Sequence, residues 1–210
     1  MDTVHPGYDK NATRRSNART KFSAAHSALE ANWNLPGPHR RAQPGQDCCM
    51  PHPNVQAVQD ALDAAGARAA DGSPSQVRIL PAAVHTAVAA AAALGVDVGQ
   101  IANSLIFDAG GEPLLVLTSG AHRANVDRLA QIAGVAKVRR ATPDFVRRHT
   151  GQVIGGVAPL GHPKPVTTIV DASLATYDEI WAAGGVPQAV FPITYTELVR
   201  ITDSQAHDVA

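Results

Sequence analysis

The 210-residue sequence has little that would support disulfide or metal chemistry. Its only two cysteines, Cys48 and Cys49, are adjacent and therefore cannot build a disulfide framework. No Cys-x-x-Cys pair and no Cys/His ligand spacing is present, so a structural zinc site is not predicted. We therefore expect neither a metal site nor a cofactor.

The motifs of several large enzyme classes are also missing. The chain has no G-x-x-x-x-G-K-[ST] sequence and no G-x-G-x-x-G opening a helix. It has no G-x-S-x-G and no H-E-x-x-H. Nucleotide hydrolysis, dinucleotide binding, serine hydrolysis and zinc proteolysis thus lack their usual sequence support.

Long apolar runs and an excess of charge are absent as well. No run approaches 18 apolar residues and the N-terminus has no apolar signal core, which predicts a cytoplasmic protein without a membrane partner. The formal net charge is zero, so the chain as a whole has no nucleic-acid signature. Apolar residues make up 45% of the chain, which is enough for a sizeable core.

Residues 1–54 differ from the rest in composition. They hold six of the fifteen prolines, and their seven Lys and Arg against four Asp and Glu give a net charge of +3. Apolar periodicity is lacking, apart from a short helical stretch at residues 24–33. We expect a poorly ordered N-terminal extension followed by one domain at residues 55–210.

Helix-like and strand-like segments alternate irregularly along residues 55–210. The apolar spacing predicts helices at residues 54–66, 81–94, 124–133, 143–150, 174–182 and 194–201. It predicts strands at residues 77–80, 103–108, 113–119, 136–140, 166–170 and 189–193, the second and third joined as a hairpin. This order favours a mixed α/β fold, with a curved mixed sheet surrounded by helices, over a doubly wound parallel sheet.

One glycine-rich segment, residues 151–161, stands out from these elements. It contains four glycines and Pro159, and no Lys, Asp, Glu, Ser or Cys. A functional role would therefore depend on backbone N–H and C=O groups, because glycine lets the backbone approach another group closely. The alternative is a glycine-rich connection between two strands.

Basic residues gather immediately before this segment. Seven of the eleven in the domain lie there, namely Arg123, Arg128, Lys137, Arg139, Arg140, Arg147 and Arg148. Between Lys137 and Arg148 the only acid is Asp144. Such a patch could neutralise a few phosphates. The alternative is a set of solvated helix and strand faces.

Small polar residues mark the ends of two predicted strands. Asn103 and Ser104 open one strand, and Ser119, His122 and Arg123 follow its hairpin partner. Residues of this kind line a pocket in some folds and only cap the next helix in others.

From residue 77 onward the chain resembles the YbaK/EbsC family, the free-standing relatives of the editing domain inserted in bacterial prolyl-tRNA synthetases. The resemblance covers roughly 130 residues and depends on the order and spacing of several segments, not on one motif. The matching segments are residues 86–96, 100–107, 115–120, 141–143, 150–161, Asp171 and residues 177–185.

This resemblance implies hydrolysis of the ester that joins a wrong, small amino acid to the terminal ribose of a tRNA. The family's G-x-x-x-P signature matches Gly155, Gly156, Val157, Ala158 and Pro159, whose backbone would hold the aminoacyl group and position water. Ser119, His122, Arg123 and Gly161 are candidate substrate contacts around it. The implied partners are the acceptor end of an aminoacyl-tRNA and an aminoacyl-tRNA synthetase. The candidate tRNA contacts are then Lys137, Arg139, Arg140, Arg147 and Arg148.

The sequence departs from the family at one position. Many members carry a lysine where this chain has Asn103, and an amide donates hydrogen bonds but brings no charge. Lys164, Arg123 and His122 are candidates to supply that charge. Three hypotheses stay open: an aminoacyl-tRNA deacylase with Asn103 in its site, a non-catalytic tRNA-binding or aminoacyl-binding module of the same fold, and a domain that binds an unrelated small molecule.

Overall fold

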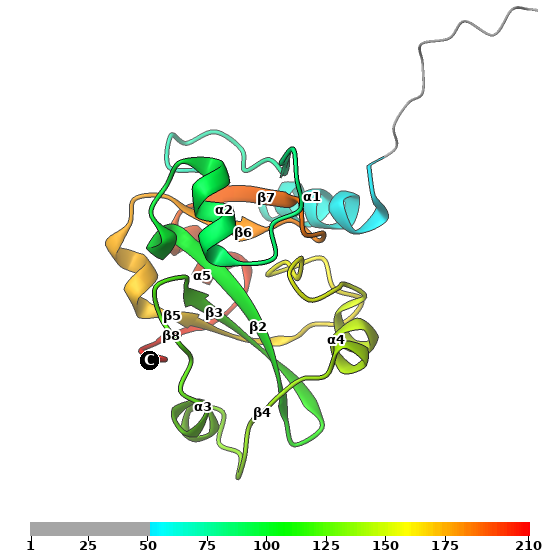
Figure 1. Ribbon diagram of the computed structural model, residues 1–210, viewed down its shortest axis with the longest axis vertical. Coiled ribbons are helices and arrows are strands. Elements are labelled where there is room, and N and C mark those ends of the chain that lie inside the picture. Colours follow the sequence, from blue (N-terminus) through cyan, green and yellow to red (C-terminus); the bar gives the residue numbers. More distant parts are fainter. Residues whose placement is uncertain (1–50) are drawn as a thin grey trace, which may run out of the picture. The chain divides into compact units, whose positions relative to one another are not determined.

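The structure, a computed structural model, describes residues 51–210, and these form a mixed eight-stranded sheet with five α-helices (Figure 1). The strands are β1 Arg78–Ile79, β2 Ile101–Ala109, β3 Glu112–Ser119, β4 Arg139–Arg140, β5 Thr167–Asp171, β6 Ile180–Ala183, β7 Ala189–Ile193 and β8 Gln205–His207. The helices are α1 Pro53–Ala65, α2 Ala87–Leu94, α3 Val126–Ile132, α4 Pro143–Thr150 and α5 Tyr195–Ile201, with 3₁₀ turns η1 Val98–Gln100 and η2 Ala172–Thr176. The predicted helix at residues 24–33 lies outside the described residues.

The strand order β1-β7-β6-β2-β3-β5-β8 confirms the predicted mixed sheet. The β2–β3 hairpin is antiparallel over eight residue pairs, whereas β3 pairs with β5 in parallel. In Figure 1, β2 runs diagonally through the middle of the sheet, with α2 in front of β6 and β7 and with α3 near β4. The β2–β3 hairpin is thus the part of the fold around which the other elements are placed.

The core is apolar and lies between this sheet and the helices. Its largest cluster joins Val58 and Leu62 of α1, Leu115 and Leu117 of β3, and Leu198 of α5. At about 25 cal/mol per Å² of buried apolar surface, each such side chain contributes roughly 2 kcal/mol to folding. This burial fixes the sheet that carries the candidate site.

Threonine caps set the starts of three helices. Thr86, Thr142 and Thr194 each accept a hydrogen bond from the backbone N–H three residues later. Such caps satisfy N–H groups that have no partner within the helix. Because Thr86 is the cap, α2 begins at Ala87, and the helix predicted from residue 81 is six residues too long.

The predicted helix at residues 174–182 is wrong. The chain instead forms η2, passes Tyr177, and enters β6, which pairs with both β2 and β7. Ile180, Trp181 and Ala182 are buried there, so the gain from completing the middle of the sheet exceeds the helix propensity of the segment.

Strand β8 has no counterpart in the prediction. Gln205, Ala206 and His207 pair in parallel with β5 at the edge of the sheet, and they carry no apolar alternation that would indicate a strand. Among the described residues, no helix is both long enough and apolar enough to cross a membrane.

Candidate functional site

The candidate site lies where one edge of β2 has no strand beside it. β6 pairs with β2 at Ile101 and Ala102, and β4 pairs with the same strand at Phe107 and Asp108. Between them, residues 103–106 have only β3 as a strand neighbour within the described part of the chain. This break in the sheet leaves room for the glycine-rich segment and for a ligand.

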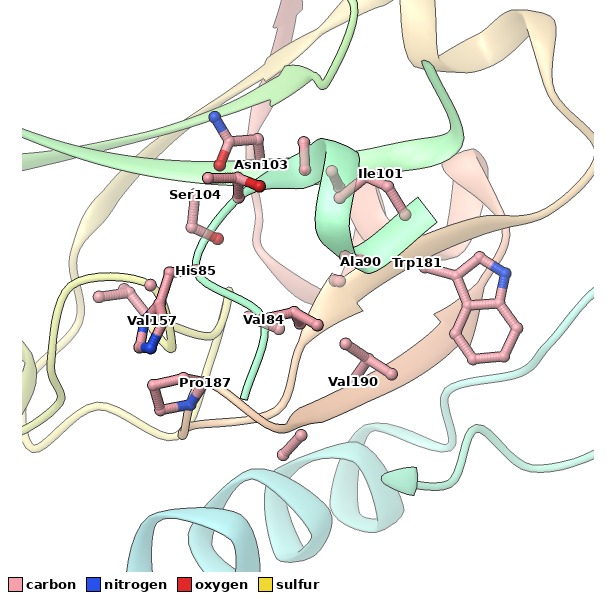
Figure 2. A pocket seen from close by; sticks show the side chains of 17 residues that line it. Val84, His85, Ala90, Ile101, Asn103, Ser104, Val157, Trp181, Pro187 and Val190 are labelled. Atoms are coloured by element: carbon pink, nitrogen blue, oxygen red, sulfur yellow. The ribbon is translucent and has the colours of Figure 1, made fainter. Parts of the chain in front are cut away.

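A small pocket with a cavity volume of about 50 Å³, here called the central pocket, opens at this break. Its lining comes from β2, β6, β7, the segment before α2 and the glycine-rich segment, and includes Asn103, Ser104, Gly155 and Val157. Two segments that the sequence analysis grouped, around Asn103 and Gly155, therefore border one pocket. Figure 2 shows His85 next to Val157, with Ser104 on the strand above them.

Two glycines give the segment its path through the pocket wall. Gly155 has φ +88°, a backbone conformation that side chains with a Cβ rarely adopt. Gly156 is buried, and a Cβ at its position would lie 2.5 Å from the carbonyl carbon of Val186. The first glycine permits the turn, and the second permits contact with the chain that leads into β7.

The same segment is held in place through the backbone of Ala158. The N–H of Ala158 donates to Oε1 of the buried Gln152 at 2.7 Å, and its carbonyl accepts from Nε2 of His162 at 2.9 Å. Burial lowers the pKa of His162, an effect that this hydrogen bond partly opposes. His162 thus donates to the loop as a neutral ring at pH 7.

The backbone N–H groups of Gly155 and Val157, unlike that of Ala158, donate to no protein acceptor among the described residues. Val157 is buried and both residues line the central pocket. Buried N–H groups are nearly always paired in proteins, so unpaired ones beside a pocket are available to a ligand. Two such donors can stabilise a negatively charged oxygen, as an oxyanion hole does.

One polar residue of this pocket, His85, was missed in the sequence, whereas Ser104 was among the polar residues noted at a strand end. His85 is the only titratable side chain in its lining, and its Nδ1 lies 3.1 Å from the position that a Cβ on Gly155 would take. The hydroxyl of Ser104 is buried without a hydrogen-bond partner among the described residues. His85 falls outside every predicted motif, and only the observation that Thr86 caps a helix could have drawn attention to it.

His122 is oriented by a buried carboxylate. Oδ2 of Asp171, a residue only 1% exposed, lies 3.0 Å from Nδ1 of His122 and accepts from the N–H of Ser119 at 3.1 Å. The second oxygen, Oδ1, accepts from the N–H of Ser173. Because Nδ1 faces the carboxylate, it carries the proton, and Nε2 has no partner among the described residues.

A second hollow, here called the arginine cavity, lies beside this histidine. It measures about 500 Å³, is open to solvent, and is lined by residues that include Asn103, Leu105, His122, Arg123 and Arg140. Asn103 lines both this cavity and the central pocket. Adjacent side chains of a strand point to opposite faces, which explains why Asn103 and Ser104 differ in their surroundings.

Other predicted site residues lie away from these two hollows. Ser119 is buried and its hydroxyl donates to the carbonyl of Gly99 at 2.9 Å. Ala158 belongs to the main core cluster, Pro159 is buried, and Gly161 lies against the backbone of α1. None of these four, and neither Gly156 nor Lys164, is in the lining of the central pocket or the arginine cavity.

The five candidate tRNA contacts divide into three positions. Lys137 and Arg139 line a shallow hollow beside the β2–β3 turn, together with Asp108. Arg140 lines the arginine cavity, and Arg147 and Arg148 lie in the last turn of α4. All five are exposed, and none forms an ion pair within the described residues. Their charges are therefore not neutralised by the domain itself.

No group of three or more His, Cys, Asp or Glu side chains within residues 51–210 is placed to hold a metal ion. The polar groups of the central pocket are instead backbone N–H groups, an amide, two hydroxyls and an imidazole. Such a set can bind and polarise a carbonyl group.

Comparison with known proteins agrees with this chemistry. The family model "Aminoacyl-tRNA editing domain" matches residues 81–201. The crystal structure of a candidate trans-editing enzyme for prolyl tRNA synthetase is 39% identical, with a TM-score of 0.69, over 76% of this chain and 98% of that one.

Two curated relatives are similar to shorter stretches. The uncharacterized protein YwhH of Bacillus subtilis (strain 168) is 30% identical over 117 residues, which are 55% of this chain and 74% of that protein. A proline–tRNA ligase of Nitratidesulfovibrio vulgaris (strain DP4) is 34% identical over 77 residues, 37% of this chain. The match spans 13% of the ligase, so it concerns one part of that enzyme.

Proposed function

Because the chain belongs to the aminoacyl-tRNA editing domain family, we propose that it hydrolyses the ester of a mischarged tRNA that carries a small amino acid. The observation that supports this most strongly is the central pocket. Gly155 and Val157, whose N–H groups are unpaired among the described residues, line the same pocket as Asn103 and His85.

In this proposal the ester carbonyl oxygen binds to the N–H groups of Gly155 and Val157. Water adds to the carbonyl carbon, and the two N–H groups stabilise the negative charge that develops on the oxygen. A single oxyanion donor is worth roughly 3 kcal/mol of the barrier. The fixed turn at Gly155 presents these donors without any rearrangement during the reaction.

We assign proton transfer to His85 and to the ribose hydroxyl next to the ester. His85 takes a proton from the attacking water. The bond between the carbonyl carbon and the ribose oxygen then breaks, and that oxygen receives the proton. The products are a free amino acid and a tRNA with an intact terminal hydroxyl. Asn103, at the boundary of the two hollows, donates a hydrogen bond to the ribose or to the ester.

The lining of the central pocket supports a small side chain. The cavity measures only about 50 Å³ between apolar walls that include Ala90, Ala102, Ala182 and Val157, which is too small for a long side chain. A difference of one methylene in such a pocket changes the transition-state energy by about 1–3 kcal/mol. Discrimination between small and bulky amino acids is therefore within reach of the pocket.

The test is a panel of tRNAs charged with glycine, alanine, serine, leucine or phenylalanine. Free amino acid released by the full chain is measured for each, with spontaneous hydrolysis subtracted. We expect faster release for the small residues than for leucine or phenylalanine. Equal rates across the panel would contradict the size assignment, and no release from any tRNA would contradict the deacylase proposal.

A binding module without turnover is the competing function, and Asn103 in place of the family lysine favours it. The variant Asn103→Lys separates the two. If the wild-type protein is inert and Asn103→Lys gains hydrolysis, the chain binds and does not cleave. If the wild-type protein cleaves, the family lysine is dispensable in this pocket.

The partners follow from the proposed substrate. We propose that the protein meets the acceptor end of a tRNA, in the cytoplasm, where tRNAs are charged. Association with a synthetase is proposed on the likeness to one segment of proline–tRNA ligases.

We also propose that the editing domain comprises residues 55–210, with residues 1–54 as an extension.

A further inference from the structure

The arginine cavity has the properties of an anion site next to the central pocket. Two guanidinium groups, those of Arg123 and Arg140, and the imidazole of His122 lie in its lining, which contains no carboxylate. Neither arginine forms an ion pair within the described residues. Leu105 and Phe107 of β2 supply an apolar floor. A cationic rim above an apolar floor suits a phosphate that is attached to a flat organic group.

His122 is fixed in a way that suits such a ligand. The main chain N–H of His122 donates to the carbonyl of Ser119 at 2.9 Å, which closes the turn after β3. The ring is held through Nδ1 by Asp171 at 3.0 Å, and the hydroxyl of Ser173 lies 3.2 Å from the same nitrogen. Nε2 therefore points away from the carboxylate. This leaves Nε2 as the ring nitrogen that a ligand in the cavity can reach.

We propose that the arginine cavity binds the 5′-phosphate of the terminal nucleotide of the tRNA, with His122, Arg123 and Arg140 as its ligands. This inference rests on the proposed function, because that nucleotide carries the ester. Asn103 lines both hollows, so a ribose beside it would place the amino acid in the central pocket and the phosphate in the arginine cavity. Its volume of about 500 Å³ lies within the range of roughly 300–1,000 Å³ that small-molecule sites occupy.

The experiment uses the full chain, with binding followed by NMR signals of the His122 side chain. The probes are adenosine 5′-monophosphate, adenosine and inorganic phosphate. We expect the nucleotide to shift the His122 signals and to bind at least about tenfold more tightly than either of the other two. Adenosine binding as tightly as the nucleotide would contradict a phosphate site. Inorganic phosphate binding as tightly would contradict a nucleotide site.

Two variants locate the site without disturbing the fold. Arg123→Gln and Arg140→Gln change exposed side chains, and each should weaken nucleotide binding roughly tenfold, because each removes a charge-assisted hydrogen bond. The matched control is Lys164→Gln, which removes an exposed charge outside both hollows and should leave nucleotide binding unchanged. A similar loss in the control would contradict the proposal.

The outcomes for this site and for the deacylase are separable. Adenosine 5′-monophosphate has no ester to hydrolyse, so its binding does not depend on turnover. Ester hydrolysis without nucleotide-induced shifts at His122 would overturn the phosphate site alone. Nucleotide binding at His122 without any hydrolysis would overturn the deacylase and leave the site in place.

Discussion

At the scale of single residues, the candidate site depends on a few polar groups placed in an apolar pocket. Asn103 lies at the boundary between the central pocket and the arginine cavity, and the sequence indicated it both as a polar residue at the start of a strand and through a family resemblance. His85 reaches the same pocket from a segment with no recognisable motif. Its position depends on where α2 begins, which in turn depends on Thr86 as the N-cap.

The first prediction concerns His85. In the variant His85→Phe the ring volume is kept but the proton acceptor is lost, so kcat should fall roughly 100-fold while KM changes little. Single-turnover deacylation measures both quantities. The control is Val88→Ala, which changes an exposed side chain of α2 that does not line the pocket. If kcat of His85→Phe equals that of the control, another group moves the proton.

At the scale of elements, two side chains hold the glycine-rich segment in place through hydrogen bonds to its backbone. Gln152 and His162 satisfy both backbone groups of Ala158, and this leaves the N–H groups of Gly155 and Val157 for a ligand. The sequence predicted a segment that acts through its backbone. It did not indicate which of its residues face the pocket, because all are small or apolar and the distinction comes from tertiary hydrogen bonds.

The sequence also predicted some of the helices and strands correctly and others wrongly. The β2–β3 hairpin and helices α3, α4 and α5 follow from apolar spacing and turn residues, and the structure confirms them. The segment that contains β6 was predicted as a helix from its apolar spacing, whereas pairing with two strands decides its state. Strand β8 lacks a local signal altogether. Long-range pairing, which a local pattern does not contain, accounts for both errors.

The second prediction concerns Gly156. A Cβ in Gly156→Ala would meet backbone atoms of Val186, so either the segment or the turn before β7 must move. We expect a loss of roughly 3 kcal/mol in the free energy of unfolding. Urea denaturation measures this. Val153→Ala, at an exposed position in the same segment, should stay within about 0.5 kcal/mol of the wild type. Equal stability of both variants would mean that Gly156 is not tightly packed.

The third prediction concerns pH and His162. Its pKa is lowered by burial, so the unfolded chain binds a proton more readily than the folded one. Stability should therefore be fully present above the ordinary histidine pKa of about 6.5 and should fall as the pH drops below it. In His162→Gln this part of the decrease should disappear. The measurement is the free energy of unfolding of both proteins between pH 8 and pH 5. A difference between the two proteins that does not change with pH would contradict the assignment.

At the scale of the whole molecule, charge is distributed unevenly although the net charge is zero. Residues 55–210 carry eleven basic and fourteen acidic residues, yet Lys137, Arg139, Arg140, Arg147 and Arg148 lie close in sequence without an ion pair among the described residues. Under the proposed function, the tRNA would bind through this local excess of cations, with limited non-specific affinity elsewhere on the protein. The two hollows and α4 would then receive the end of one RNA strand.

The fourth prediction is a change in salt dependence. Replacing both Arg147 and Arg148 with alanine should lower the slope of log affinity for tRNA against log salt by about 1.5, since each phosphate contact contributes roughly 0.7–0.9. Filter binding at several salt concentrations measures it. Both arginines are exposed on α4, so the fold should be retained. An unchanged slope would place the RNA elsewhere on the protein.

The most direct test of the central claim is multiple-turnover deacylation. The full chain is mixed with a tenfold excess of a tRNA mischarged with alanine, and the amount of released alanine is compared with the amount of protein. If the pocket of Gly155, Val157 and Asn103 catalyses ester hydrolysis, alanine release will exceed the amount of protein several-fold and will stop at complete deacylation. Retention of the tRNA on the protein, with release no faster than in buffer alone, would contradict the claim and identify a binding module.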